Sequence, residues 1–224
     1  MTRRGLAIFD LDGTLFRADV VTVPAVQRTF EAHGLPAPPP EAIRPFIGRP
    51  TPELHAWLCS LAGPDLGPRI AAEVDDRETA LVTEAGGLYP GVPEVLAALR
   101  AQGTTLAICT NGPKPYVDAV VDGFGLRPFF SAIRHLERDG DSKASMIREL
   151  LVRLPARPAV MVGDREIDVD AAHAGGLPAI GVTYGMGTAA DLSAADALAQ
   201  SACELPGLIA RLLDVEAPEG EGRP

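Results

Sequence analysis

The sequence predicts an α/β protein whose Rossmann-like, three-layer core has a central parallel sheet, and whose chain carries an inserted all-helical cap domain. Short apolar runs alternate with segments of helical periodicity, which is typical of strand–helix–strand units. Residues 16–86 interrupt this alternation with helical patterns alone. The chain has 224 residues and 46% hydrophobic content, which is enough to bury a large core.

The predicted core elements follow one another in a regular order. Four short apolar runs predict buried strands over residues 6–9, 104–109, 159–162 and 179–182. A helix begins at Pro93 and ends at Gly103, because Pro favours the first helical turn and Gly the helix end. Further helices are predicted over residues 114–124, 143–154, 168–174 and 206–213. This order favours a parallel sheet covered on both faces, with functional groups at the carboxyl ends of its strands.

The segment that interrupts the core contains amphipathic patterns and a Pro-rich connection. Its helices are predicted over residues 23–32, 51–61 and 70–83. We therefore divide the chain into a core of residues 1–15 and 87–215, a helical cap of residues 16–86 and a disordered acidic tail of residues 216–224. Because the cap joins the core at the mouth of the sheet, it would be either a lid that excludes water or a rigid second layer.

Charge and hydropathy exclude several classes of partner. The formal net charge of −10 at pH 7 disfavours nucleic acid or an anionic membrane as the main partner. The N-terminal apolar stretch ends at Asp10, which makes it too short for a signal peptide or a membrane span. We expect a cytoplasmic protein that acts on a small molecule, and predict no particular oligomeric state. An anionic substrate would need local cations or a metal ion.

Two carboxylates directly follow the first predicted strand. Asp10 and Asp12 stand two residues apart in the sequence Asp-Leu-Asp-Gly-Thr. Like charges at a strand end repel each other and lose hydration, so they are tolerated mainly where a cation or a reaction uses them. The alternative is an acidic turn, in which Gly13 supplies the bend and Asp12 or Thr14 caps the next segment. The pair alone favours neither interpretation.

Three further segments end at the same edge of the predicted sheet. Thr110 and Asn111 follow the second strand, although an ordinary Asn-Gly turn would also explain them. Lys143 opens a helix, where a cation is unfavourable, so we expect a nearby anion unless the side chain is simply solvated. Asp164 ends the third strand and is a candidate metal ligand, whereas Asp168 could be the N-cap of the next helix.

Taken in order, these segments resemble the haloacid dehalogenase superfamily of phosphotransferases, particularly its phosphoglycolate-phosphatase-like branch with a helical C1-type cap. The resemblance covers roughly residues 5–187. Its first motif, Asp-x-Asp-Gly-Thr at 10–14, and its last, Gly-Asp-x-x-x-Asp at 163–168, are specific. Thr110 and Lys143 support it through their order between those motifs.

The resemblance implies a Mg²⁺-dependent phosphatase that hydrolyses a small phosphorylated metabolite through an aspartyl-phosphate intermediate. Asp10 would attack phosphorus, while Asp12 would act first as general acid and then as general base. Mg²⁺ would be held by Asp10, the backbone carbonyl of Asp12, Asp164 and waters. Thr110 would bind a phosphoryl oxygen, and Lys143 would neutralise the nucleophile and the transferring group.

The remaining motif residues have supporting roles in this resemblance. Asp168 would orient Lys143 or a metal-bound water, and Asn111 would complete the phosphate cradle with backbone amides of the first loop. Arg49, in a predicted cap loop, and Arg17, beside the hinge, are candidates for binding a carboxylate or second phosphate, although a solvated position is the commoner fate of such arginines. Phosphoglycolate, a sugar phosphate, a nucleotide and pyrophosphate all fit as substrates.

The sequence also discriminates among related activities. Asp12 argues against a dehalogenase, which has no phosphoryl leaving group to protonate, and residues 16–86 contain no lysine for Schiff-base cleavage of a phosphonate. A phosphomutase of the same superfamily is an alternative, but Thr22 stands where such relatives carry a cap histidine. A non-catalytic phospho-accepting or metal-binding domain is an alternative of another class. Asp12 disfavours it, because a nearby acid/base would hasten the loss of a phosphoaspartate.

Overall fold

A computed structural model describes residues 5–138 and 140–214, so the predicted tail of residues 216–224 lies outside the described residues. Within these ranges, six strands form one parallel sheet in the order β3-β2-β1-β4-β5-β6. The strands are β1 (Leu6–Phe9), β2 (Thr105–Pro113), β3 (Ala132–Leu136), β4 (Ala159–Gly163), β5 (Ala179–Val182) and β6 (Ala197–Ala199). The predicted fold class is confirmed, and β1 lies in the middle of the sheet between β2 and β4.

Helices cover both faces of this sheet. One face carries α5 (Val92–Ala101), α6 (Lys114–Gly123) and α9 (Leu205–Leu213), and the other carries α7 (Lys143–Arg153) and α8 (Glu166–Ala174). The side chains of β1 alternate between the two layers: Ala7 and Phe9 join the first apolar cluster, and Leu6 and Ile8 join the second. Since all four are fully buried, β1 has the near-continuous apolar sequence expected of a central parallel strand.

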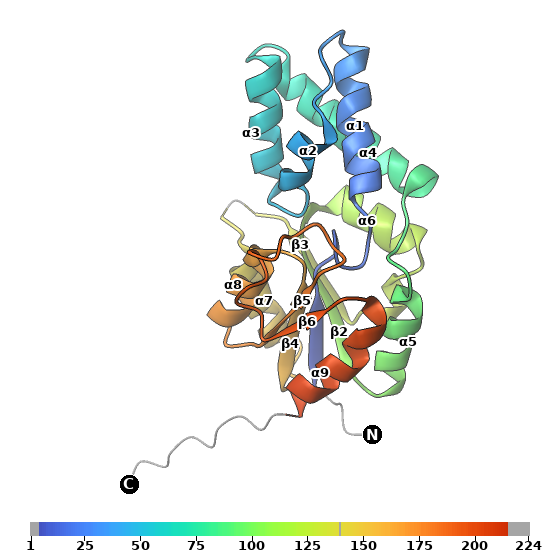
Figure 1. Ribbon diagram of the computed structural model, residues 1–224, viewed down its shortest axis with the longest axis vertical. Helices are drawn as coiled ribbons and strands as arrows, with labels where there is room; N and C mark the ends of the chain where they lie inside the picture. The colour runs from blue at the N-terminus through green and yellow to red at the C-terminus, as the bar shows by residue number, and fades with distance from the viewer. Residues whose placement is uncertain (1–4, 139, 215–224) are drawn as a thin grey trace.

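The chain between β1 and α5 forms a separate group of helices above the carboxyl ends of the strands (Figure 1). We call residues 19–85 the helical insert. It contains α1 (Asp19–Ala32), α2 (Pro40–Ile43), α3 (Thr51–Ala62) and α4 (Gly67–Ala85), with the 3₁₀ turn η1 (Arg44–Phe46). Helices α1 and α3 both pack against α4, and their buried apolar residues continue the cluster on one face of the sheet.

Some elements differ from the sequence prediction for identifiable reasons. The strand β3 was not predicted because Arg134 and His135 interrupt its apolar pattern, yet both are buried. Arg134 is neutralised there by Asp141 at 2.8 Å and Glu149 at 2.9 Å. The other unpredicted strand, β6, has only three residues. Two further 3₁₀ turns, η2 (Arg127–Phe129) and η3 (Ala202–Glu204), lie in the connections.

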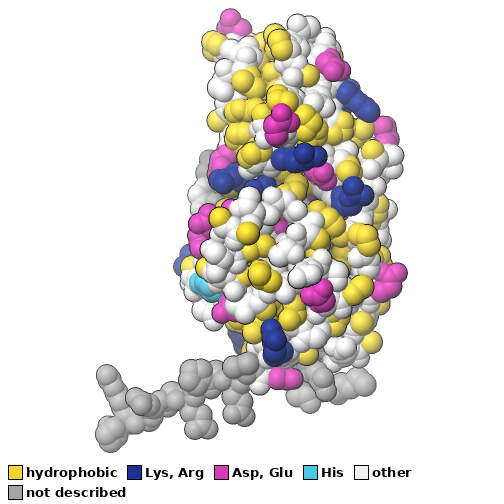
Figure 2. Space-filling view, viewed as in Figure 1, with side chains coloured by type: hydrophobic (Ala, Val, Ile, Leu, Met, Phe, Trp, Pro, Cys, Tyr) yellow, Lys and Arg dark blue, Asp and Glu magenta, His cyan; other side chains and the backbone are white. Residues whose placement is uncertain are grey.

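Cations gather along the boundary between the helical insert and the sheet on the face shown in Figure 2. Four arginines line cavities on this boundary: Arg17, Arg44, Arg49 and Arg165. Acidic side chains, among them Asp19, Asp141 and Asp191, line the same cavities, so the boundary carries charges of both signs. None of the helices within residues 5–138 and 140–214 has the length and apolar character needed to cross a membrane.

Candidate active site

The carboxyl ends of the central strands bring three predicted site residues to one edge of the sheet. Asp10 directly follows β1, Thr110 lies within β2, and Asp164 directly follows β4. The backbone N–H of Asp10 donates to the Val162 carbonyl at 2.9 Å, so the parallel pairing continues to the start of the loop. All three side chains are buried. The parallel topology therefore gathers residues that are more than fifty positions apart in the sequence.

Lys143 supplies the cation of this cluster. It is the first residue of α7, which Ser142 caps, and its side chain is 1% exposed. Its Nζ donates to Oδ1 of Asp10, and to Oδ1 of Asp168 at 2.6 Å. Burial alone would lower the pKa of Lys143, but the two carboxylates outweigh burial and raise it. The expected nearby anion is therefore present, and the interpretation of Lys143 as a solvated lysine is wrong.

Three carboxylates in the cluster form a site suited to a cation. One oxygen from each of Asp10, Asp164 and Asp168 lies within 4.8 Å of the others. Oδ2 of Asp10 and Oδ1 of Asp164 are buried and have no hydrogen-bond partner. Burial raises the pKa of Asp10 well above its ordinary range, and burial with the Asp168 charge raises the pKa of Asp164 to about 7. Unpaired carboxylate oxygens are costly in such a place, and they are the ligands that a hard divalent cation prefers.

The loop around Asp164 is packed closely enough to fix its orientation. Oδ2 of Asp164 accepts hydrogen bonds from the backbone N–H groups of Met186 at 2.8 Å and Gly187 at 3.2 Å, which leaves Oδ1 as the unpaired oxygen. Gly13 has a φ of +86°, and a Cβ at that position would lie 2.3 Å from Oδ2 of Asp164. A side chain at Gly13 would therefore displace the Asp164 carboxylate. Glycine is needed at this position both for the backbone turn and to leave room for that carboxylate.

The capping interpretation of the first motif is wrong. The N-cap of α1 is Ala18, and the buried hydroxyl of Thr14 has no hydrogen-bond partner. Helix α1 begins at Asp19 instead of near residue 23, and Pro24 lies inside it. A helix over residues 23–32 would have Pro24 in its first turn, where proline is commonest, but in α1 it occupies a later position.

Asp168 lies in the first turn of α8 and is not its N-cap. The N-cap is Arg165, so the helix begins two residues before the predicted start. Oδ2 of Asp168 accepts from the backbone N–H of Arg165 at 3.0 Å, while its Oδ1 accepts from Lys143. One carboxylate thus fixes the start of α8 and the position of the buried ammonium.

Asp12 faces a different environment from Asp10. Its Oδ1 accepts a hydrogen bond from the hydroxyl of Tyr116 at 2.6 Å, and its side chain lines a cavity of about 40 Å³. Burial raises the pKa of Asp12 to about 6, although the Tyr116 hydrogen bond opposes that rise. Glu78 and Thr22 of the helical insert line the same cavity and are hydrogen-bonded to each other. Tyr116 was not predicted from the sequence; its signal there is its position in the first turn of the helix that follows the Thr110 motif.

Thr110 and Asn111 have separate environments despite being neighbours. The Thr110 hydroxyl is buried at the sheet edge and accepts from the backbone N–H of Gly112 at 3.2 Å. Nδ2 of Asn111 donates to the Gly48 carbonyl of the helical insert at 3.0 Å, and Oδ1 of Asn111 is buried without a partner. Thr110 therefore lies at the sheet edge where Asp10 follows β1, and Asn111 connects the core to the insert.

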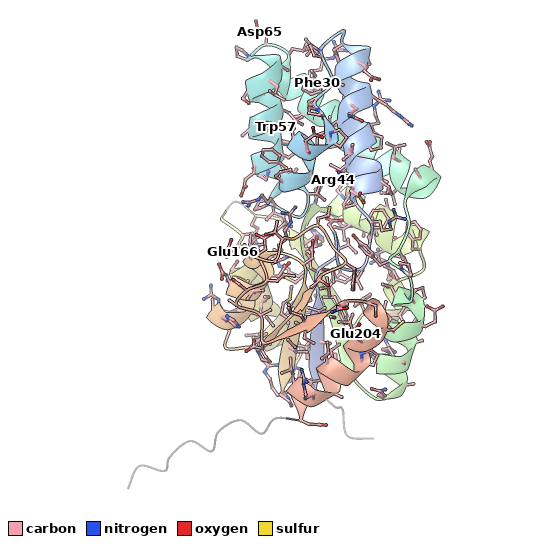
Figure 3. All side chains as sticks on the ribbon, in the orientation of Figure 1. Phe30, Arg44, Trp57, Asp65, Glu166 and Glu204 are labelled. Atoms are coloured by element: carbon pink, nitrogen blue, oxygen red, sulfur yellow. The ribbon has the colours of Figure 1, made fainter. Side chains whose placement is uncertain are left out.

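Arg165 makes a second connection to the helical insert, which the sequence did not predict. Its Nη2 donates to the carbonyls of Arg44 at 2.9 Å and Ile47 at 2.8 Å. Arg44 lies at the end of the insert next to the core, and Glu166, which follows Arg165, marks the start of α8 across the boundary (Figure 3). The residue after the metal-ligand candidate Asp164 therefore holds the loop that covers the site.

The two arginines predicted to bind substrate lie on different sides of this boundary. Arg49 lines the cavity that contains Asp12, but its Nε donates to the Pro45 carbonyl at 3.0 Å and its side chain is half exposed. Arg17 lines a separate cavity of about 380 Å³ with Arg44. Neither guanidinium contacts the carboxylate cluster, so the structure brings Arg49 near the site and leaves Arg17 outside it.

Comparison with known proteins identifies the family of this constellation. A family model described as "Haloacid dehalogenase-like hydrolase" matches residues 7–182. The chain belongs to this family. A relative named "Phosphoglycolate phosphatase, plasmid" from Cupriavidus necator is 35% identical over 217 residues, covering 90% of this chain and 91% of the relative. A phosphoglycolate phosphatase from Shigella boydii is 33% identical over 229 residues, covering 90% of both chains.

The fold of this haloacid dehalogenase-like hydrolase also matches solved structures. The crystal structure of a predicted phosphatase from Clostridium acetobutylicum superposes with a TM-score of 0.80 at 27% sequence identity, covering 94% of this chain and all of that one. The family resemblance inferred from the Asp-x-Asp-Gly-Thr and Gly-Asp-x-x-x-Asp motifs is therefore confirmed.

Proposed function

We propose that this hydrolase is a Mg²⁺-dependent phosphatase that hydrolyses a small phosphate monoester through an aspartyl-phosphate intermediate. The observation that carries the proposal is the buried cluster in which Lys143 pairs with Asp10 while one oxygen each of Asp10 and Asp164 lacks a partner. This arrangement offers an oriented nucleophile and a cation site at one sheet edge. The names of the curated relatives support a phosphate ester as the substrate.

Asp10 and Asp12 have different parts in the proposed reaction. In the first step Asp10 forms a bond to phosphorus as the ester P–O bond breaks, and Asp12 gives its proton to the leaving oxygen. In the second step water attacks phosphorus and gives a proton to Asp12, and the bond between phosphorus and Asp10 breaks. Asp12 suits both steps because a group with a pKa of about 6 exchanges protons near neutral pH.

The charges around phosphorus come from the chain and from the proposed metal. Asp10, Asp164 and the backbone carbonyl of Asp12 would hold Mg²⁺, whose charge, when bound, lets an anionic carboxylate approach an anionic phosphate. Lys143 places a fixed positive charge on Asp10, and the Thr110 hydroxyl is available to a phosphoryl oxygen. Asp168 holds Lys143 in place, so its role is to position the ammonium.

The helical insert is the proposed cap, and the size of the cavity beside Asp12 bears on the substrate. We divide the chain at residues 16 and 86, which lie just outside the first and last helices of the insert. The cavity beside Asp12 is about 40 Å³, far below the roughly 300–1,000 Å³ of sites for drug-sized ligands. A leaving group of only a few heavy atoms fits it, and this favours a small ester such as phosphoglycolate over a nucleotide.

Hydrolysis is favoured over phosphoryl transfer within a sugar phosphate. A mutase of this superfamily would need an acid/base from the cap at the position of Thr22. The Thr22 hydroxyl is instead hydrogen-bonded to Glu78, and an aliphatic hydroxyl is too weak an acid and too weak a base to act as a general acid/base near neutral pH. Water is therefore the proposed acceptor of the phosphoryl group.

A panel of phosphate esters tests the proposal. The purified protein should release inorganic phosphate from at least one of phosphoglycolate, sugar phosphates, nucleoside monophosphates, pyrophosphate and p-nitrophenyl phosphate, and EDTA should abolish the release. Asp10→Asn should remove the activity, and acid-quenched unmodified enzyme should carry phosphate on the peptide containing Asp10. Asp164→Asn should raise the Mg²⁺ concentration needed for half-maximal activity by about 10-fold or more. No release from any ester by the unmodified protein would exclude the proposed function.

A further inference from the structure

We infer that Tyr116 is a positioning residue that holds the Asp12 carboxyl so that its proton faces the leaving group. The inference rests on the proposed function and extends it, because it concerns how the acid/base is oriented. Its starting point is the 2.6 Å hydrogen bond from the Tyr116 hydroxyl to Oδ1 of Asp12, which joins residues 104 positions apart. No other side chain in the described ranges donates to the Asp12 carboxylate.

The Tyr116 hydroxyl is held in a fixed position. Tyr116 lies in the first turn of α6, immediately after the end of β2, and is 3% exposed. Its ring packs edge-on against Phe16, with 6.3 Å between ring centroids. Phe16 in turn belongs to the loop that carries Asp12, since its carbonyl accepts from the backbone N–H of Gly13 at 2.9 Å. Ring packing and the hydrogen bond therefore fix the same loop to the start of α6.

The hydrogen bond distinguishes the two carboxyl oxygens of Asp12. Because the Tyr116 hydroxyl donates to Oδ1, a proton on the carboxyl belongs on Oδ2. Oδ2 is then the oxygen that can exchange a proton with a molecule in the cavity that Asp12 lines. The arrangement persists in both protonation states, since Oδ1 accepts from the tyrosine whether or not Oδ2 carries the proton.

The same cavity is where the leaving group must lie. Asp12 and Tyr116 form its wall on the core side, and Glu78, Thr22 and Gly48 belong to its wall on the insert side. Glu78 is already hydrogen-bonded to Thr22, so the Tyr116 hydroxyl is left to Asp12. A leaving oxygen in this space would find Oδ2 as the Asp12 oxygen that does not accept from the tyrosine.

Orientation matters because a carboxyl group turns easily. Its terminal torsion has broad wells, and a general acid must come within about 2.6–3.2 Å of the oxygen that it protonates. Without the Tyr116 hydroxyl, the Asp12 carboxyl can rotate and present its proton away from the leaving oxygen. The loss of kcat/KM on removing the Tyr116 hydroxyl should be largest for an alkyl ester, whose leaving oxygen needs the proton. It should be smallest for an acyl phosphate, whose leaving group departs as a stable anion.

Tyr116→Phe tests this expectation, because phenylalanine keeps the ring and removes the hydroxyl. We would measure kcat/KM with acetyl phosphate and with the alkyl phosphate that the unmodified enzyme hydrolyses fastest. The ratio kcat/KM reports the first phosphoryl transfer, so slow hydrolysis of the intermediate does not mask the effect. For the alkyl ester, kcat/KM should fall by about 10-fold or more, while for acetyl phosphate it should change by less than about 3-fold.

Two further variants distinguish positioning from damage to the fold. Tyr89→Phe makes the same chemical change at a tyrosine that lines a different cavity and whose hydroxyl has no hydrogen bond within the described residues. The kcat/KM of this variant should therefore be unchanged with both substrates. In an Asp12→Asn background, Tyr116→Phe should have no further effect on the ratio of the two substrates, because the group that it positions is already gone.

The outcomes separate this inference from the proposed function. An equal loss with both substrates, or no loss with either, would overturn the positioning role while leaving the phosphatase intact. A selective loss that persists in the Asp12→Asn background would also overturn it, because the hydroxyl would then act without Asp12. Failure of the unmodified protein to hydrolyse any ester would instead reject the proposed function, and the inference with it.

Discussion

Lys143→Met should separate the electrostatic role of Lys143 from its contribution to packing. Methionine preserves most of the length and apolar volume of the lysine stem, so the change removes mainly the charge. In the metal-free protein it leaves Asp10 and Asp168 without the ammonium to which both are bonded. With the neighbouring Asp164, three carboxylates whose oxygens lie within 4.8 Å of one another would then share a buried site.

The expected cost follows from this burial. Removing one partner of a buried ion pair typically costs about 3–5 kcal/mol. At about 2–4 °C per kcal/mol for a chain of this size, the midpoint of thermal unfolding should fall by on the order of 10 °C. Mg²⁺ should raise the midpoint more in Lys143→Met than in the unmodified protein, because the ion can replace part of the missing charge. Phosphatase activity should fall by about 10²–10³-fold.

Lys114→Met is the matched control, because Lys114 and Lys143 are the two lysines of the chain. Lys114 is 65% exposed and pairs with Asp118 one helical turn away, a surface contact worth about 0.5 kcal/mol or less. Calorimetry with and without Mg²⁺ would compare the two variants. If Lys143→Met unfolded within a degree or two of Lys114→Met and kept its activity, the buried charge would not have the role assigned to it.

Two predictions concern the helical insert and its contact with the core. Burial raises the pKa of Glu78 to about 8, so the folded protein retains a proton that the unfolded chain loses near its ordinary pKa of 4.5. The contribution of Glu78 to stability should therefore be fully present below about pH 4.5 and be lost as the pH rises through 8. Since Glu78 is partly exposed, we expect this loss to be about 2 kcal/mol, and Glu78→Gln should remove it from the pH dependence of the unfolding free energy measured in urea. Arg165→Met removes two hydrogen bonds to the insert and should cost about 1–3 kcal/mol and increase proteolysis within residues 44–50; an unchanged cleavage pattern would contradict the connection.

The predictable part of the fold is the part in which local pattern and tertiary environment agree. The strands predicted over residues 6–9 and 179–182 match β1 and β5, since continuous burial selects continuous apolar sequence. In β3 the two disagree, because Arg134 is acceptable in a buried position only with Asp141 and Glu149 beside it. Those partners lie outside the strand, so the pattern of the strand alone could not indicate them.

The candidate site also has a part that the sequence could predict and a part that it could not. The carboxylates Asp10 and Asp164 could be placed at one sheet edge from the sequence, because parallel topology brings strand ends together. The hydrogen bond between Tyr116 and Asp12 could not be predicted, because it depends on the angle at which α6 leaves β2 and on the packing of one ring. Sequence pattern places residues on elements, whereas contacts between side chains of different elements depend on tertiary geometry.

The connections between the insert and the core suggest how cap position and catalysis are coupled. Arg165 and Asn111 bind carbonyls of the insert, and each is the immediate neighbour of a cluster residue, Asp164 or Thr110. Opening of the proposed cap would break these hydrogen bonds, each worth about 0.5–1.5 kcal/mol net because water can replace it. A longer hydrogen bond, from the Thr51 hydroxyl of the insert to the Asn111 carbonyl at 3.5 Å, would break with them. With these bonds made, Gly48 lines the cavity beside Asp12, so the proposed proton transfer to the leaving group would be partly shielded from bulk water.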